Sequence, residues 1–189
     1  QLPNAPDALY TLGSALKDSG YRWVMVQEHT VETLTGEGIR HSHLPHRLVA
    51  RNSQGQEVSI TALIKTQGSD TKLIGQMQPY YEAKTLGQVT LGSQSVPPLV
   101  SQISDGENGG VMMNEFPGAF KRAWHEARHE SGITGINGTE YIELLAAAGV
   151  EESDFPPCQA IGQHHLWQTL ADDDITPERV SAAIANLAE

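Results

Sequence analysis

Apolar side chains recur along this chain at two spacings, one typical of helices and one typical of strands. Near the start, Leu9, Leu12 and Leu16 fall three or four positions apart, so they would line one face of a helix. That helix is expected over residues 5–18 and should end at Gly20, because glycine readily adopts the left-handed conformation that closes helices. The pattern then changes to short apolar runs, which have the length of buried strands.

The same criteria predict an alternation of strands and helices over the rest of the chain. Strands are expected over 21–26, 47–51, 58–64, 98–104 and 133–136, and helices over 69–81, 116–129, 139–148 and from Pro177 onwards. Such alternation is typical of α/β folds with largely parallel pairing. We therefore expect residues 1–189 to form a single α/β domain, with the β-hairpin of the second and third strands as an insertion and helices at the C-terminus. A parallel sheet this small has two open edges and looks incomplete.

Composition limits the kinds of molecule that the chain is expected to bind. The chain carries 12 basic and 23 acidic residues, a formal net charge of −11, which argues against nucleic acid and anionic membranes as partners. No apolar run is long enough to cross a bilayer. The single cysteine, Cys158, excludes an intrachain disulfide and has no evident base beside it. It is expected to be inert, and the presence of a single cysteine favours a reducing compartment such as the cytoplasm.

Polar side chains follow four of the predicted strands at the point where each strand ends. They are Gln27, Glu28 and His29 after the first, Lys65 after another, Asp105, Glu107 and Asn108 after a third, and Asn137 with Glu140 after a fourth. The carboxyl ends of parallel strands in a barrel converge on one face, which is the catalytic face. Residues 104–110 are the richest of these ends, with two carboxylates and an amide in a glycine-rich loop. A solvated turn explains the same local sequence, because Asp-Gly and Asn-Gly are common turn formers.

A rival chemical pattern is the HExxH sequence at residues 125–129. Histidines four apart on a helix can both reach one Zn²⁺, with the glutamate acting as base on the bound water. Against this, Arg128 lies between the two histidines, and Gly135 stands where the longer zinc-peptidase motif has its third ligand. A charged, solvent-facing helix side accounts for the same residues, so a zinc metallopeptidase is the less favoured alternative. A second group of histidines consists of His41, His43 and His46. Their spacing matches no standard metal-ligand motif, so it indicates a structural or substrate-contacting loop.

Several segments, read together, resemble glycoside hydrolase family 57, and in particular its uncharacterised members. They cover residues 20–30, 64–72, 105–110, 112–116 and 137–141. The resemblance runs from the first residue to about 150 and more loosely to the end. It implies part of a seven-stranded (β/α) barrel that acts on an α-glucan or oligosaccharide. The reaction implied is that of a retaining amylase, 4-α-glucanotransferase, branching enzyme or α-galactosidase, without a metal or an organic cofactor.

The resemblance also implies roles for single residues. Asp105 matches the general acid/base, and Glu107 would orient Asp105 or bind a sugar hydroxyl. The other residues expected to bind substrate are Gln27, Glu28, His29, Lys65 and Asn108. The family's nucleophile block would fall before residue 1, so the chain matches the C-terminal half of the barrel.

A retaining glycosidase needs two carboxyl groups about 5–5.5 Å apart. The 189 residues alone are therefore not expected to hydrolyse glycosides. Activity is expected only when the missing N-terminal half, or a second copy of the chain, completes the site. A non-catalytic glycan-binding or structural relative is the alternative.

Overall fold

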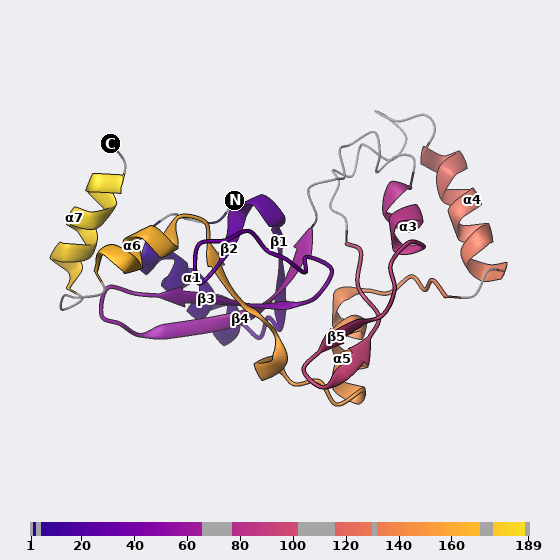
Figure 1. Ribbon diagram of the computed structural model, residues 1–189, viewed down its shortest axis with the longest axis horizontal. Helices are drawn as coiled ribbons and strands as arrows, with labels where there is room; N and C mark the ends of the chain where they lie inside the picture. The colour runs from indigo at the N-terminus through magenta and orange to yellow at the C-terminus, as the bar shows by residue number, and fades with distance from the viewer. Residues whose placement is uncertain are drawn as a thin grey trace.

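The computed structural model describes residues 2, 5–65, 77–101, 116–129, 132–170 and 176–187. Its largest element is a five-stranded sheet (Figure 1) with the strand order β1-β4-β3-β7-β2. The strands are β1 (Trp23–Gln27), β2 (Val31–Thr33), β3 (His46–Arg51), β4 (Glu57–Lys65) and β7 (Pro157–Ala160). Pairing is mixed: β1 is parallel to β4 and β3 to β7, whereas β3 with β4 and β2 with β7 are antiparallel.

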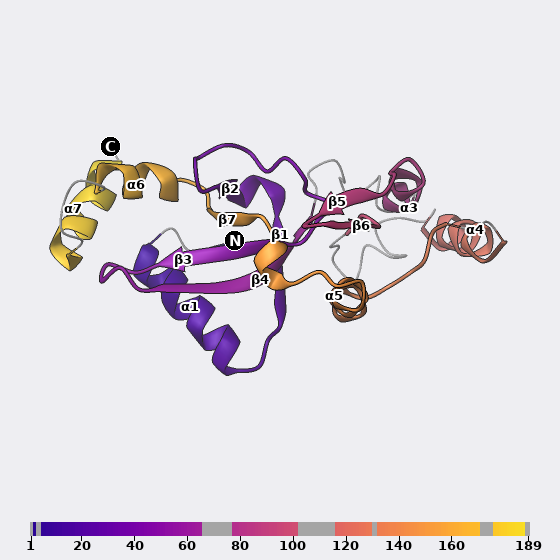
Figure 2. The ribbon, with the colours of Figure 1, turned by 60° about the horizontal axis from the view of Figure 1, so that its bottom comes forward.

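Helices and a small hairpin make up the other regular elements of the described residues. The helical elements are α1 (Pro6–Asp18), η1 (Glu28–Thr30), α3 (Gln78–Ala83), α4 (Phe116–His129), α5 (Gly138–Ala147), η3 (Glu152–Asp154), α6 (Gln163–Thr169) and α7 (Pro177–Leu187). The hairpin pairs β5 (Val89–Leu91) with β6 (Gln94–Val96). Helix α1 contacts β3 and β4, and α6 packs with α7. In Figures 1 and 2, α3 and α4 lie at the opposite end of the molecule from α6 and α7.

The sheet is curled. Only η1 joins β1 to β2, so the Cα atoms of Gln27 and Val31 are at most about 14 Å apart. These strands are the two edges of the sheet, and in a flat sheet four strand spacings would separate them by about 19 Å. Curling resolves the conflict and is consistent with one apolar cluster that takes side chains from all five strands: Val26, Val31, Leu48, Ile60, Ala62, Ile64 and Cys158. The described strands nevertheless do not close a barrel.

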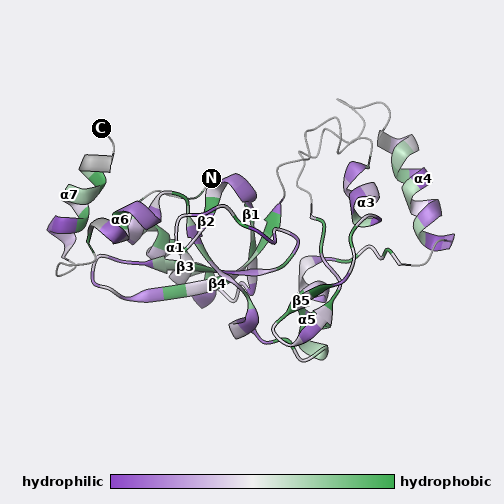
Figure 3. Ribbon diagram, viewed as in Figure 1, coloured by the Kyte–Doolittle hydropathy of each residue, from purple (hydrophilic) through white to green (hydrophobic). Residues whose placement is uncertain are grey.

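Strand β4 is buried on both of its faces. Ile60, Ala62 and Ile64 belong to the cluster on the α1 side. Leu63, which points the other way, packs in a second cluster with Leu145 of α5. Double burial explains why the end of β4 is almost continuously apolar, as its green colour in Figure 3 shows. Much of α4, by contrast, is hydrophilic and purple in the same view.

Several predicted elements are confirmed. The mixed α/β character of the chain is as expected. Helices α1, α4 and α5 begin and end within a residue or two of their predicted limits, and α7 begins at Pro177 as predicted. The hairpin of β3 and β4 is also present. Its expected place as an insertion into a parallel sheet is wrong, because β4 pairs with β1 on one side and β3 on the other. The expected largely parallel pairing is therefore wrong as well.

Two predicted strands and part of one helix are corrected. Residues 98–101 form no strand, since Pro97 and Pro98 lack the N–H groups that a ladder needs; residues 102–104 lie outside the described ones. Residues 133–136 also form no strand; Gly132 precedes them and Gly135 lies within them. The helix expected over 69–81 cannot run unbroken into α3, because Met77 has a left-handed φ of 62°.

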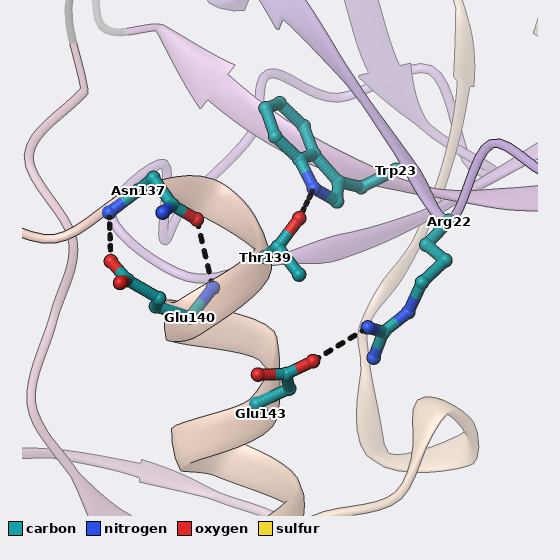
Figure 4. A network of polar contacts seen from close by, with 6 residues as sticks. All are labelled: Arg22, Trp23, Asn137, Thr139, Glu140 and Glu143. Carbon is teal, nitrogen blue, oxygen red and sulfur yellow. Dashed lines mark hydrogen bonds and ion pairs between the residues drawn. The ribbon is translucent and has the colours of Figure 1, made fainter.

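Polar contacts attach α5 to the start of β1 (Figure 4). The Trp23 Nε1–H group donates to Thr139 Oγ1 at 3.0 Å, and Arg22 Nη1 pairs with Glu143 Oε1 at 2.8 Å. Asn137 and Glu140 cap the helix reciprocally: the Glu140 N–H donates to Asn137 Oδ1 and the Asn137 N–H to Glu140 Oε2. The helix start is thereby fixed against the indole of Trp23.

Among the residues that the structure describes, no helix is both long and apolar enough to cross a membrane.

This junction leaves no space for a side chain at Gly138. An ideal Cβ there would lie 2.5 Å from Trp23 Cζ2 and 2.8 Å from Leu63 Cδ1. We expect Gly138→Ala to lower the free energy of unfolding by about 1–3 kcal/mol through overpacking, measured by urea denaturation. Gly135→Ala is the matched control, because a Cβ at Gly135 meets nothing within 4 Å. Equal stabilities of the two variants would contradict the packing described for α5.

Candidate functional site

The carboxyl ends of β1 and β4 lie side by side. In their parallel ladder Gln27 is the register partner of Lys65, so two of the polar residues that follow predicted strands are brought together. Side chains alternate along a strand, so Gln27 points to the same face as Trp23, and Lys65 to the same face as Leu63. That is the face covered by α5. Gln27 is exposed and Lys65 is half-buried, so both can be reached from solvent.

Ser101 is fixed at the same end of the sheet. Its side chain is buried, and its Oγ–H donates to the Ile64 carbonyl at 2.7 Å, one residue before the end of β4. Two residues earlier, the Leu99 N–H donates to the His43 carbonyl at 2.8 Å. These bonds hold the segment 97–101 beside the end of β4 in place of a strand ladder.

His43 and Glu82 complete this end of the sheet. Because β3 begins with His46 opposite Ala62, the loop before it continues toward the end of β4. In this loop His43 Nε2 lies 3.4 Å from Glu82 Oε1 of α3. We call the following five residues the strand-end site: Gln27, His43, Lys65, Glu82 and Ser101. Sequence spacing gave no signal for Glu82 or Ser101, since their partners are 39 and 37 positions away.

The remaining candidates from the sequence are distributed differently. Glu28 and His29 lie in η1 directly after β1, next to Gln27. Asp105, Glu107 and Asn108 lie outside the described residues. Asn137 and Glu140 do not join the strand-end site: they cap α5, whose Thr139 meets Trp23 at the opposite end of β1 from Gln27. Their polar side chains form hydrogen bonds that cap the start of α5.

The histidine groups are also separated. His46 is buried and its Nδ1–H donates to the Leu44 carbonyl at 3.0 Å, whereas His43 faces Glu82. In α4 the rings of His125 and His129 lie 4.5 Å apart, as their spacing predicts. Among the described residues, no three His, Cys, Asp or Glu side chains form a group suited to a metal ion. The structure thus adds no third ligand to the HExxH pair within that part of the chain.

Two buried features lie apart from the strand-end site. A cavity of about 210 Å³ between α1 and the sheet is lined mainly by apolar side chains, among them Leu9, Leu16 and Val26. Cys158 is buried among apolar groups, and this burial raises the pKa of its thiol to about 12. The thiol is therefore protonated at neutral pH and a poor nucleophile.

Comparison of the chain with protein-family models, with curated proteins and with solved structures finds no match.

Burial of His46 makes stability depend on pH. Desolvation lowers the pKa of its imidazole below 6.5, and the charge of His41 adds to this, whereas the bond to Leu44 opposes it. Above pH 6.5 the ring is neutral in both the folded and unfolded states, and its contribution to stability is complete. As the pH falls below 6.5 the unfolded chain binds a proton first, so the free energy of unfolding decreases, by at most about 1.4 kcal/mol per pH unit.

We expect His46→Asn to show a shallower loss of stability between pH 7 and pH 5 than the parent protein. Urea denaturation at several pH values would measure it. His165→Asn, at an exposed position, serves as the control and should retain the parent slope. Parallel profiles for the parent and His46→Asn would contradict the assignment of a buried neutral imidazole.

Proposed function

We propose that this protein is carbohydrate-active, binds an α-glucan or oligosaccharide at the strand-end site, and takes part in retaining glycoside hydrolysis or transfer. The observation that carries the proposal is the in-register end of β1 and β4, with Ser101 tied to β4 beside it. Two segments that resemble family 57 adjoin these positions in the sequence. Residues 64–72 begin at the end of β4, and residues 105–110 begin four positions after Ser101. Asp105 is four residues from Ser101, a span of at most about 14 Å.

In this proposal Asp105 is the general acid/base. It would protonate the glycosidic oxygen while a second carboxylate attacks the anomeric carbon, and would then activate the water or sugar hydroxyl that releases the glycosyl intermediate. Glu107 and Asn108 would assist by orienting Asp105 or binding hydroxyl groups, together with Gln27, Glu28, His29 and Lys65. No step requires a metal or an organic cofactor. The net charge of −11 is compatible with a neutral polyhydroxyl ligand.

The second carboxylate is proposed to come from a partner: a polypeptide that carries the N-terminal half of such a barrel, or a second copy of this chain. In support, β1 and β2 are the edges of the described sheet, and an open edge is a template for pairing. The protein is proposed to act in the cytoplasm, where a single buried cysteine stays reduced.

Titration with maltoheptaose by isothermal calorimetry tests ligand binding. We expect saturable binding by the 189-residue protein, weakened about tenfold in Lys65→Ala, because a hydrogen bond from a charged group contributes about 1.5–3 kcal/mol. Lys17→Ala, in the last turn of α1, is the control and should bind like the parent. Absence of binding to maltoheptaose, or equal weakening by both lysine variants, would refute a glucan site at the strand ends.

Sedimentation equilibrium tests the proposed partner. In the absence of a partner, we expect the purified chain of 20.5 kDa to self-associate, giving a species of at least twice that mass. Addition of a polypeptide that carries the N-terminal half of such a barrel should convert this species to a one-to-one complex that hydrolyses maltoheptaose. A stable monomer with cooperative unfolding, or turnover by the isolated chain, would contradict this part of the proposal.

A further inference from the structure

His43 and Glu82 form a pair whose hydrogen-bonding capacity is only partly used. Their side chains are 24% and 28% exposed, and the Nε2–Oε1 distance of 3.4 Å exceeds the 2.7–2.9 Å of a well-formed charge-assisted bond. A carboxylate has about four acceptor positions. Within the described part of the chain, His43 supplies the single polar contact of the Glu82 carboxylate. Partly desolvated acceptors of this kind favour ligands that bring O–H or N–H donors.

The ring of His43 presents Nε2, the nitrogen that lies near Glu82, to a ligand. Its Nδ1 atom is buried and has no hydrogen-bond partner among the described residues, so the ring meets a ligand through Nε2. The backbone around it is fixed, because Leu44 and Pro45 are buried and the His43 carbonyl accepts the Leu99 N–H. A rigid backbone reduces the entropy lost when a ligand binds.

The position of the pair identifies the chemical class of ligand. Ser101, bonded to the end of β4, follows Leu99 by two residues, so the pair lies within the strand-end site, beside the end of β4. An anionic group would meet repulsion from Glu82 and from the net charge of −11. A neutral hydroxyl can accept from the His43 Nε2–H and donate to Glu82 Oε1 at the same time, which satisfies both atoms.

We propose that His43 and Glu82 form a sugar-binding subsite in which one hydroxyl group of an α-glucan bridges the two side chains. This inference rests on the proposed function and gives two residues of the strand-end site a recognition role. The sequence placed His43 in a structural or substrate-contacting loop and gave no role to Glu82. Catalysis is not part of their role. Apo contacts of this kind are often long and shorten when the ligand is bound.

Maltoheptaose titrations of three variants test the subsite. We expect Glu82→Gln and His43→Asn each to weaken binding about tenfold, with melting temperatures close to that of the parent because both side chains are partly exposed. If one hydroxyl bridges the pair, the double variant should bind about as weakly as the weaker single variant. Glu37→Gln is the matched control, because Glu37 is an exposed carboxylate paired with Arg40.

The outcomes separate this inference from the function on which it rests. Parent-like binding by Glu82→Gln and His43→Asn would overturn the subsite and leave the proposed function standing. Fully additive losses in the double variant would overturn the bridging hydroxyl. No binding of maltoheptaose by the parent would overturn both the subsite and the function. If His43→Asn lowers the melting temperature, the near-isosteric Glu82→Gln decides the matter.

Discussion

The parallel ladder between β1 and β4 is the interaction on which the rest of this structure depends. It pairs five consecutive residues of each strand, from Trp23 with Thr61 to Gln27 with Lys65. Because β4 is also paired with β3 and packed on both faces, the ladder fixes the position of β1 relative to α1, α5 and the rest of the sheet. A one-residue slip in its register would move Leu63 from the α5 core to the opposite face.

The short link from β1 to β2 is the second constraint. A link of three residues cannot span a flat five-stranded sheet, so the sheet curls and its two edges approach each other. Curling also lets one apolar cluster draw on every strand of the sheet. The strand-end site is thus held by the ladder, by the Ser101 bond to Ile64 and by the Leu99 bond to His43.

Local pattern predicted the elements of this fold better than their arrangement. Helices such as α4 carry their signal in residues three and four apart, and the β3–β4 hairpin carries its signal in the turn between two apolar runs. The central position of the hairpin has no local signal, because it depends on which strand β4 meets on its far side. Similarly, Asn137 and Glu140 have the spacing of a capping box, and their reciprocal hydrogen bonds show that they cap α5.

In the candidate site, too, the residues with a local sequence signal could be predicted and the contacts between distant segments could not. Gln27 and Lys65 could be found from the sequence, since both follow apolar runs and parallel strands align their ends. The pairing of His43 with Glu82 could not, because a contact between a loop and a helix 39 residues later has no periodicity. Asp105, the residue on which the resemblance to family 57 depends most, lies outside the described residues. Its catalytic role therefore remains a proposal supported by the position of Ser101.

A crystal structure of the protein grown with maltoheptaose tests the central claim most directly, namely that the carboxyl ends of β1 and β4 form a glucan site. The account predicts a sugar chain at these strand ends, with hydroxyl groups in hydrogen-bond contact with Gln27 or Lys65. Sugar bound elsewhere, such as against α1 or α7, with the strand ends unoccupied at saturating ligand, would contradict it.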